Sequence, residues 1–236
     1  MSDNKKSNGI FKIVIASLVI IGLVKWFRPQ TIPFDFFHFW KTGGSIIEAV
    51  KNSWLLFAWG AGLSTVLALR TYNDPDDNRD AEGLFVCGVL SSAWAGIAEE
   101  ICFRWLIFYA AIPLLKLVNF LFFGFLGFGV YEWVYMIILI PVANLVTLDY
   151  LRPILFNGYG WAVGAAIVCV NGKFRDAHAH MGRLAWVNAW FCGMFLFYLM
   201  FNYGLPAAII VHFLYNLFID IINYIDAVIE RRLGWV

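Results

Sequence analysis

The chain has 236 residues, of which 61% are hydrophobic and only 14% are charged, and its formal net charge is +1. Soluble domains are about half apolar and about a quarter charged, so this composition excludes an ordinary soluble globular protein. The near-neutral charge also gives no indication of a nucleic-acid partner. The excess apolar surface needs membrane lipid as its solvent, so the sequence predicts an integral, multi-pass membrane protein.

Candidate membrane spans follow one another along almost the whole chain. A spanning helix needs about 20 mostly apolar residues, and residues 10–27 supply the first candidate. No small-residue cleavage site follows it, which favours an uncleaved anchor over a signal peptide. Residues 46–69 give a second candidate, and the polar residues 70–82 after it predict a solvated loop. Six further candidates lie at residues 84–112, 114–129, 130–147, 155–171, 184–203 and 205–225.

These candidates predict an all-α fold, a polytopic transmembrane helical bundle of seven or eight spans. The alternation that a membrane β-barrel would need, over strands of about ten residues, is absent from the sequence. We treat residues 1–236 as a single transmembrane domain in which residues 1–69 form N-terminal anchor helices. Lysines near the N-terminus, together with Arg231 and Arg232, predict cytoplasmic N- and C-termini. The compact length favours a bacterial cell membrane.

Three clusters of polar residues interrupt the apolar segments, and the first contains Glu99, Glu100 and Arg104. A charge at membrane depth costs roughly 2.5–3.5 kcal/mol, so a residue of this kind usually has a function. On a helix Glu100 and Arg104 are four residues apart and can pair, whereas Glu99 points about 100° away. This pattern indicates one structural carboxylate and one that is available for proton transfer. The alternative is a purely structural ion pair that ends a helix at the membrane interface.

The other two clusters contain three of the four histidines of the chain. One is a polar segment between two candidate spans and contains His178 and His180, where the alternative is an ordinary solvated loop. The other contains His212, Asn216 and Asp220, which are spaced by four residues and so lie on one stripe of an apolar helix. Such a stripe is typical of a polar interior or a catalytic wall.

Together these residues supply carboxylates, imidazoles and an amide, but no activated serine or cysteine nucleophile. That set suits general-base activation of a water molecule, with imidazole and amide donors for a developing oxyanion. A zinc site is the chemical alternative, since two histidines, a glutamate and a water form a known catalytic set. Its ligands would be Glu99, His178 and His212. The sequence has no HExxH motif, so its signal for a metal site is nonspecific. We expect no cofactor, with zinc as the alternative.

Three short motifs carry a resemblance to a known family: EEICFR at residues 99–104, FRDAH at 174–178 and HFLYN at 212–216. They resemble the EExxxR, FxxxH and HxxxN motifs of the CPBP family, which comprises CAAX proteases and Abi-type bacteriocin-processing enzymes. The continuation AHAH is similar to the Ras-converting-enzyme branch, and GLPAAIIV before the last motif also fits the family. The resemblance covers residues 84–220, which we therefore regard as a protease-like core.

The resemblance implies a CAAX-type intramembrane glutamate protease, an endopeptidase that cleaves a lipidated or membrane-embedded peptide. In that scheme Glu99 and His178 position and deprotonate a water molecule, while His212 and Asn216 stabilise the oxyanion. His180 is a second candidate for the role of His178, and the sequence leaves the choice between them open. The substrate would enter laterally from the lipid, and no metal ion takes part.

The resemblance also implies a supporting set around these residues. Glu100 and Arg104 hold the site together as a buried pair. Phe103 and Phe174 pack around that pair.

Two other functions are compatible with the sequence. A non-catalytic membrane scaffold or immunity protein of the same fold would need the polar residues for stability and not for turnover. A proton- or cation-coupled transporter would also keep glutamate and histidine within the membrane. The chain has no internal repeat and no pair of glycine- or proline-broken helices, which counts against the transporter.

Overall fold

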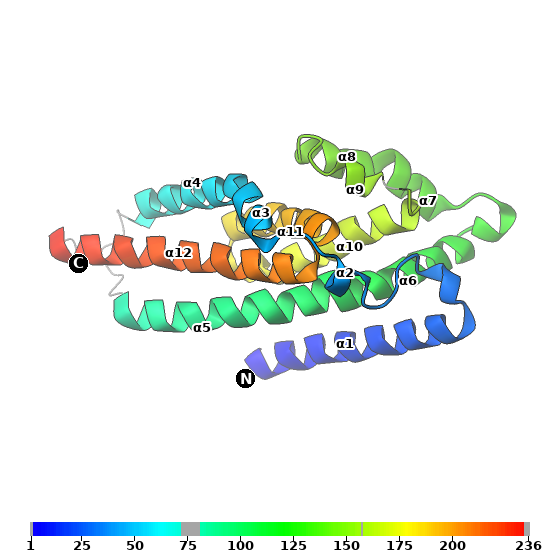
Figure 1. Ribbon diagram of the computed structural model, residues 1–236, viewed down its shortest axis with the longest axis horizontal. Coiled ribbons are helices and arrows are strands. Elements are labelled where there is room, and N and C mark those ends of the chain that lie inside the picture. The colour runs from blue at the N-terminus through cyan, green and yellow to red at the C-terminus, as the bar shows by residue number, and fades with distance from the viewer. Residues whose placement is uncertain (1, 72–80, 157, 234–236) are drawn as a thin grey trace.

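The computed structural model describes residues 2–71, 81–156 and 158–233, and every regular element in these ranges is helical. Most of the long helices follow one common direction and form an elongated bundle (Figure 1), in agreement with the predicted all-α fold. The long helices are α1 (Ser2–Phe27), α4 (Trp54–Thr71), α5 (Ala81–Glu99), α6 (Phe108–Leu121), α10 (Trp161–Ala177), α11 (Arg183–Tyr203) and α12 (Leu205–Leu233). The shorter elements are η1 (Pro29–Thr31), α2 (His38–Lys41), α3 (Ile46–Asn52), η2 (Glu100–Ile107), η3 (Gly124–Leu126), α7 (Val130–Val134), η4 (Tyr135–Leu139), α8 (Ile140–Val146), α9 (Arg152–Leu155) and η5 (Ala179–Met181).

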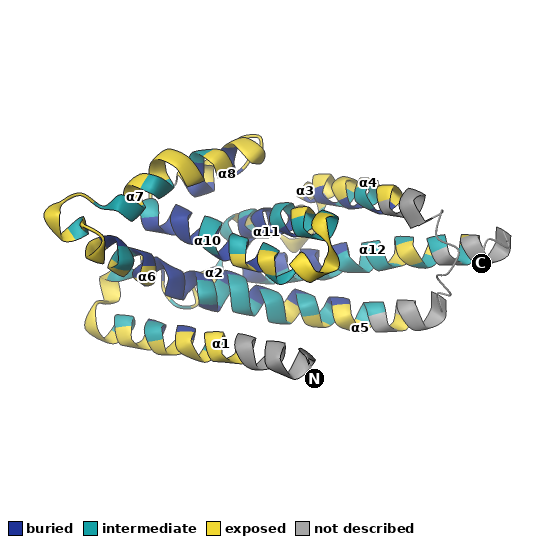
Figure 2. Cartoon of the chain, turned by 180° about the vertical axis from the view of Figure 1, so that it is seen from behind, coloured by how far each residue is buried: buried dark blue, intermediate teal, exposed yellow. Residues whose placement is uncertain are grey.

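Three helical stretches of the described chain are long and apolar enough to cross a membrane: Gly88–Leu121, Arg183–Tyr203 and Leu205–Asp226. Trp54–Val66 and Val130–Val146 are shorter apolar helices. Many large apolar side chains are exposed on the outer surface of the bundle, as the yellow faces in Figure 2 illustrate. These features are compatible with a membrane protein. The predicted number of seven or eight spans is not confirmed by them.

One predicted boundary differs from the structure. The stretch Gly88–Leu121 is one continuous helical segment, so the predicted division between residues 84–112 and 114–129 is wrong. Pro113 lies inside α6, and packing of the buried residues around it keeps the helix continuous despite one missing backbone hydrogen bond. The predicted loop at residues 70–82 lies mostly outside the described residues.

The polar segment between the two late spans is also more ordered than the loop alternative suggested. Helix α10 continues through it to Ala177. Phe174 is buried on the inner side of this extension, and the Arg175 guanidinium lies 4.1 Å from the centre of the Trp186 ring. Because these contacts anchor the last turns of α10, His178 occupies a defined position at the end of a helix.

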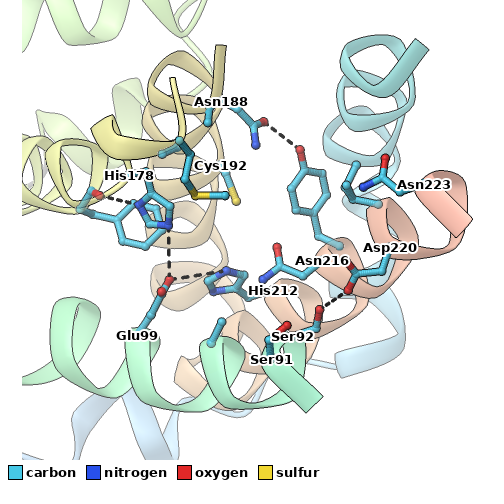
Figure 3. A pocket seen from close by; sticks show the side chains of 17 residues that line it. Ser91, Ser92, Glu99, His178, Asn188, Cys192, His212, Asn216, Asp220 and Asn223 are labelled. Carbon is cyan, nitrogen blue, oxygen red and sulfur yellow. Dashed lines mark hydrogen bonds and ion pairs between the residues drawn. The ribbon is translucent and has the colours of Figure 1, made fainter. Parts of the chain in front are cut away.

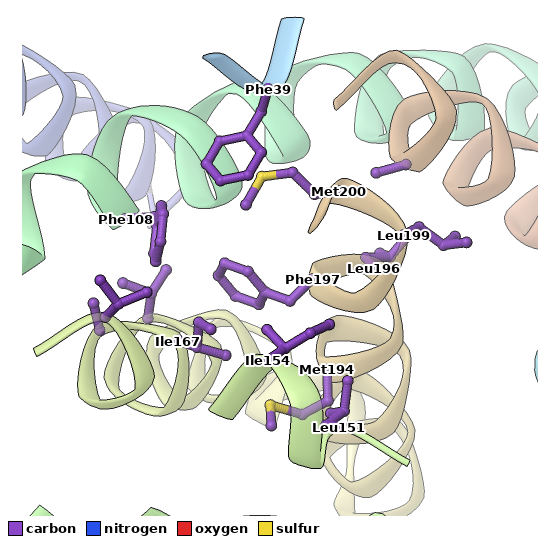
Figure 4. Packing of buried hydrophobic residues seen from close by; sticks show 14 of the residues in the cluster. Phe39, Phe108, Leu151, Ile154, Ile167, Met194, Leu196, Phe197, Leu199 and Met200 are labelled. Carbon is purple, nitrogen blue, oxygen red and sulfur yellow. The ribbon is translucent and has the colours of Figure 1, made fainter. Parts of the chain in front are cut away.

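The apolar core lies where α6, α10 and α11 meet, with a contribution from α2 (Figure 4). Phe108, Ile167 and Phe197 are completely buried in it, and the rings of Phe108 and Phe197 have their centres 5.5 Å apart. Phe39 from α2 also packs into this cluster. The core therefore fixes the relative positions of three helices that carry or flank the polar clusters.

Small residues on α5 allow this helix to approach α12 closely. Gly88, Ser92 and Gly96 are four residues apart and so share one face of the helix. A Cβ atom added at Gly96 would lie only 3.1 Å from the Ile209 carbonyl oxygen and from Phe213 Cβ. Small residues at this spacing are typical of close helix pairs in membranes. The close approach brings the polar stripe of α12 against α5.

Replacing Gly96 with valine should destabilise the protein, because the added side chain would overlap the backbone of α12. Overpacking of this kind costs about 1–3 kcal/mol, so thermal unfolding in detergent should occur at a clearly lower temperature. Gly62→Val in α4 is the matched control, since no atom outside the adjoining backbone of its own helix lies within 4 Å of a Cβ atom added there. Equal unfolding temperatures for the two variants would contradict the close packing of α5 on α12.

Candidate active site

A π-helical turn begins between two adjacent glutamates. Helix α5 ends at Glu99, and η2 follows from Glu100 with a wider turn of a kind that often occurs at functional sites. The side chain of Glu99 is 31% exposed, whereas those of Glu100 and Arg104 are completely buried. The two carboxylates therefore lie in different environments. This difference is what the predicted division into one structural carboxylate and one proton-transfer carboxylate requires.

Glu100 is the centre of a buried polar network. Its Oε1 atom lies 3.1 Å from Arg104 Nη1 and 2.8 Å from His212 Nδ1, so the predicted pairing of Glu100 with Arg104 is confirmed. The guanidinium carbon of Arg104 lies 3.9 Å from the centre of the Phe174 ring, a cation–π contact. Phe103 packs edge-on against the same ring at 5.3 Å. The network thus joins η2 to α12 through a carboxylate and to α10 through an aromatic ring.

Space for the Arg104 guanidinium depends on Gly193 in α11. A Cβ atom added at Gly193 would overlap Asn171 Oδ1 and lie 2.9 Å from Arg104 Nη2. Asn171 is buried in α10 and donates a hydrogen bond from Nδ2 to the Trp190 carbonyl oxygen at 3.0 Å. Neither Gly193 nor Asn171 was predicted from the sequence. A buried asparagine at the end of an apolar segment is a usable signal, whereas a glycine in an apolar helix is not.

A cavity of about 400 Å³ opens between α5, α10, α11 and α12 (Figure 3). Its lining includes the four residues predicted to be catalytic, Glu99, His178, His212 and Asn216. Glu99 Oε2 lies 3.9 Å from His178 Nε2 and 4.0 Å from His212 Nε2. Asp220 lines the cavity as well, so the predicted polar stripe of α12 does face one polar space.

Hydrogen bonds fix which nitrogen of each imidazole carries a proton. His178 Nδ1 lies 2.8 Å from the Phe174 carbonyl oxygen, which can only accept, so Nδ1 donates. His212 Nδ1 donates in the same way to Glu100 Oε1. In the neutral rings both Nε2 atoms are then acceptors, and both face Glu99 Oε2. His212 can donate from Nε2 only as an imidazolium, with Glu100 on its other side.

His180 does not share this space. It is exposed on η5, its Nδ1 atom lies 2.9 Å from the Ala177 carbonyl oxygen, and it is not part of the cavity lining. His178 lines the cavity beside Glu99. Of the two histidines between which the sequence could not choose, His178 is therefore the one with the geometry for chemistry.

Asn188 connects three helices at the side of the cavity. Its Oδ1 atom accepts hydrogen bonds from the Tyr215 hydroxyl at 2.8 Å and from Trp59 Nε1 at 3.0 Å. These bonds join α11 to α12 and to α4. Asn188 was missed in the sequence, although a polar residue within the apolar segment 184–203 is a signal that could have found it. Tyr215 and Trp59 gave no such signal among the many aromatic residues.

The zinc site considered as the chemical alternative would use Glu99, His178 and His212 as its ligands. Among the described residues, no group of three or more histidine, cysteine, aspartate or glutamate side chains is placed to hold a metal ion. The Nδ1 atoms of His178 and His212 are hydrogen-bonded to protein oxygens, and metal-ligating histidines commonly show the same arrangement.

Comparisons with known proteins give no assignment for this site. No protein-family model, no curated protein and no solved structure matches the chain. Its interpretation therefore rests on the geometry and on the three sequence motifs at residues 99–104, 174–178 and 212–216.

Replacing Arg104 with methionine should strongly destabilise the protein. The change leaves the Glu100 carboxylate buried without its cation, and breaking a buried pair in this way costs about 3–5 kcal/mol. The double variant Glu100→Gln with Arg104→Met should recover much of this loss, because no uncompensated charge is left. Thermal unfolding in detergent measures both effects. A single variant as stable as the double one would contradict the structural role of the pair.

Proposed function

We propose that this chain is an intramembrane endopeptidase of the CPBP family, which hydrolyses a peptide bond in a lipidated or membrane-embedded substrate. The proposal rests on the convergence of Glu99 with two imidazoles, whose Nε2 atoms lie 3.9 and 4.0 Å from one carboxylate oxygen. A single water molecule, at about 2.8 Å from each of two such acceptors, can bridge them. The arrangement supports activation of that water molecule as a nucleophile.

In this mechanism Glu99 and His178 act on the water molecule. One of its hydrogens is donated to Glu99 Oε2 and the other to His178 Nε2, which directs its oxygen toward the scissile carbonyl. As the new oxygen–carbon bond forms, the proton passes to one of these acceptors, which then returns it to the leaving amine. General acid–base catalysis of this kind contributes about 10²–10⁴-fold to the rate.

His212 and Asn216 act on the oxygen of the scissile carbonyl. Asn216 donates from its amide, and His212 donates from Nε2 as an imidazolium whose Nδ1 is hydrogen-bonded to Glu100. One such donor contributes about 10²–10³-fold to turnover. Glu100 and Arg104 act through His212 and do not touch the substrate, so they are positioning residues.

The proposal includes the family and the membrane topology. The three motifs that resemble the CPBP family supply every residue of this mechanism, which supports the assignment. Three helical stretches of the described chain with the length and apolarity of membrane spans support a membrane location. We expect a bundle of seven or eight spans in a bacterial cell membrane, with cytoplasmic termini and lateral entry of the substrate from the lipid.

Glu99→Gln should abolish peptide cleavage, because the amide keeps the shape of the side chain but cannot take the proton from water. We expect kcat/KM to fall by at least about 100-fold with purified protein in nanodiscs, and the unfolding temperature to stay unchanged. A strong chelator should leave wild-type cleavage intact. Equal activity of the variant and the wild type would contradict the proposal.

The remaining outcomes of this assay point to the other functions. Loss of wild-type cleavage with the chelator would move Glu99, His178 and His212 into a metal site. Folded wild-type protein that cleaves no membrane peptide would favour a scaffold or immunity protein. Ion-dependent uptake into liposomes that is lost in Glu99→Gln would favour a transporter.

The two neighbouring histidines offer a matched pair of variants. His178→Ala should lower kcat by about 100-fold or more, since it removes one of the two acceptors for the water molecule. His180→Ala should leave kcat nearly unchanged, because His180 lies outside the cavity lining. Similar losses in the two variants, measured with the same peptide, would refute the assignment of the base to His178.

A further inference from the structure

Asp220 is a charged residue of the cavity that the proposed mechanism does not use. It lies on the same stripe of α12 as His212 and Asn216, and it lines the part of the cavity away from Glu99 (Figure 3). Ser91 and Asn223 line the cavity as well. This part of the cavity is therefore polar, although it lies between apolar helices.

The carboxylate of Asp220 is held against α5 by two small residues. The Ser92 hydroxyl donates a hydrogen bond to Asp220 Oδ2 at 2.5 Å. A Cβ atom added at Gly88 would lie 2.9 Å from Asp220 Cγ and 3.0 Å from Oδ2. The absence of a side chain at Gly88 and the hydroxyl of Ser92 together fix the position of the charge.

This carboxylate has no counter-ion within the described part of the chain. No ion pair between described residues involves Asp220. Among the described residues that line the cavity there are two carboxylates, those of Glu99 and Asp220, and neither lysine nor arginine. A cavity lined in this way favours a positively charged ligand near Asp220 over a negatively charged one.

The position of Asp220 relates the charge to the proposed reaction. Eight residues of α-helix separate it from His212, which corresponds to about 12 Å along the axis. An extended peptide covers about 3.3–3.6 Å per residue, so three to four residues of a bound substrate span that distance. A lysine or arginine at that place in the substrate would bring its charge to the carboxylate.

We propose that Asp220, seated on Gly88 and Ser92, forms a subsite for a basic side chain of the substrate, three to four residues from the scissile bond. This inference rests on the proposed peptidase function for the position of the bond. The recognition itself, of a cationic side chain by a carboxylate in a polar pocket, is independent of turnover and can be measured by binding.

The test uses apolar transmembrane peptides that carry one lysine, placed in turn at each position within about five residues of the cleaved bond. Matched peptides carry norleucine instead. With wild-type protein in nanodiscs, lysine at one position on one side of the bond should raise kcat/KM about tenfold over norleucine. Asp220→Asn should remove this preference while it cleaves the norleucine peptide at the wild-type rate.

Ser92→Ala is the matched control, because it removes the hydrogen bond to Asp220 but keeps the charge. It should retain most of the preference for lysine. If both variants instead slow the cleavage of all peptides equally, Asp220 is only a structural contact between α5 and α12, and the inference is wrong. It is also wrong if the wild type shows no preference at any position.

Binding of the same peptides separates this inference from the proposed function. Dissociation constants measured with Glu99→Gln should show about tenfold tighter binding of the lysine peptide, and this difference should vanish in Glu99→Gln with Asp220→Asn. Selective binding by a wild type that cleaves no peptide would overturn the peptidase function and leave the cationic subsite standing. Cleavage without selective binding or selective turnover would overturn only the subsite.

Discussion

A single carboxylate oxygen, Glu100 Oε1, faces both the Arg104 guanidinium and the His212 imidazole inside the helix bundle. Removing these groups from water is costly, and only their mutual arrangement offsets that cost. The Arg104–Glu100 contact at 3.1 Å is an ion pair without hydrogen-bond geometry, and the Arg104 guanidinium also makes a cation–π contact with the ring of Phe174. The network therefore depends on η2, α10 and α12 keeping their positions.

This network also sets the chemistry on the side of His212 that faces the cavity. Because His212 Nδ1 is hydrogen-bonded to Glu100, only its Nε2 atom can contact water or substrate. The Phe174 carbonyl oxygen imposes the same orientation on His178. Two imidazoles whose Nδ1 atoms are hydrogen-bonded to protein oxygens then face Glu99. The side chain of Glu99 is 31% exposed, compared with 23% for His178 and 4% for His212. The buried Glu100–Arg104 pair thus orients His212, although neither residue of the pair is part of the cavity lining.

Close helix packing makes this arrangement possible, and small side chains make the packing possible. Gly193 leaves room for Arg104 and Asn171, while Gly96 brings α5 against α12. Larger residues at either position would separate the helices whose polar groups form the cavity. The same packing brings Asp220 within hydrogen-bond distance of Ser92. The cavity therefore contains the proposed reaction centre around Glu99 and a second negative charge at Asp220.

The sequence predicted the all-α fold and the apolar segments 130–147, 184–203 and 205–225 well, because long apolar runs are a strong local signal. It placed a boundary at Pro113 that the structure lacks, since buried neighbours stabilise a helix through a proline. The residues at which a helix begins and ends depend on packing against other helices, and the local hydrophobic pattern carries no information about that packing.

For the site, the sequence by itself determined which residues carry charge or imidazole within apolar segments. Such residues are rare there because placing a charge within the membrane costs free energy. Helical spacing also gave the Glu100–Arg104 pair, since four residues bring side chains together on one helix. Only the tertiary structure decided that His212 meets Glu100, that His178 and not His180 faces Glu99, and that Asn188 and Gly193 matter. Periodicity relates residues along one helix, whereas contacts between helices arise from how side chains pack across the bundle.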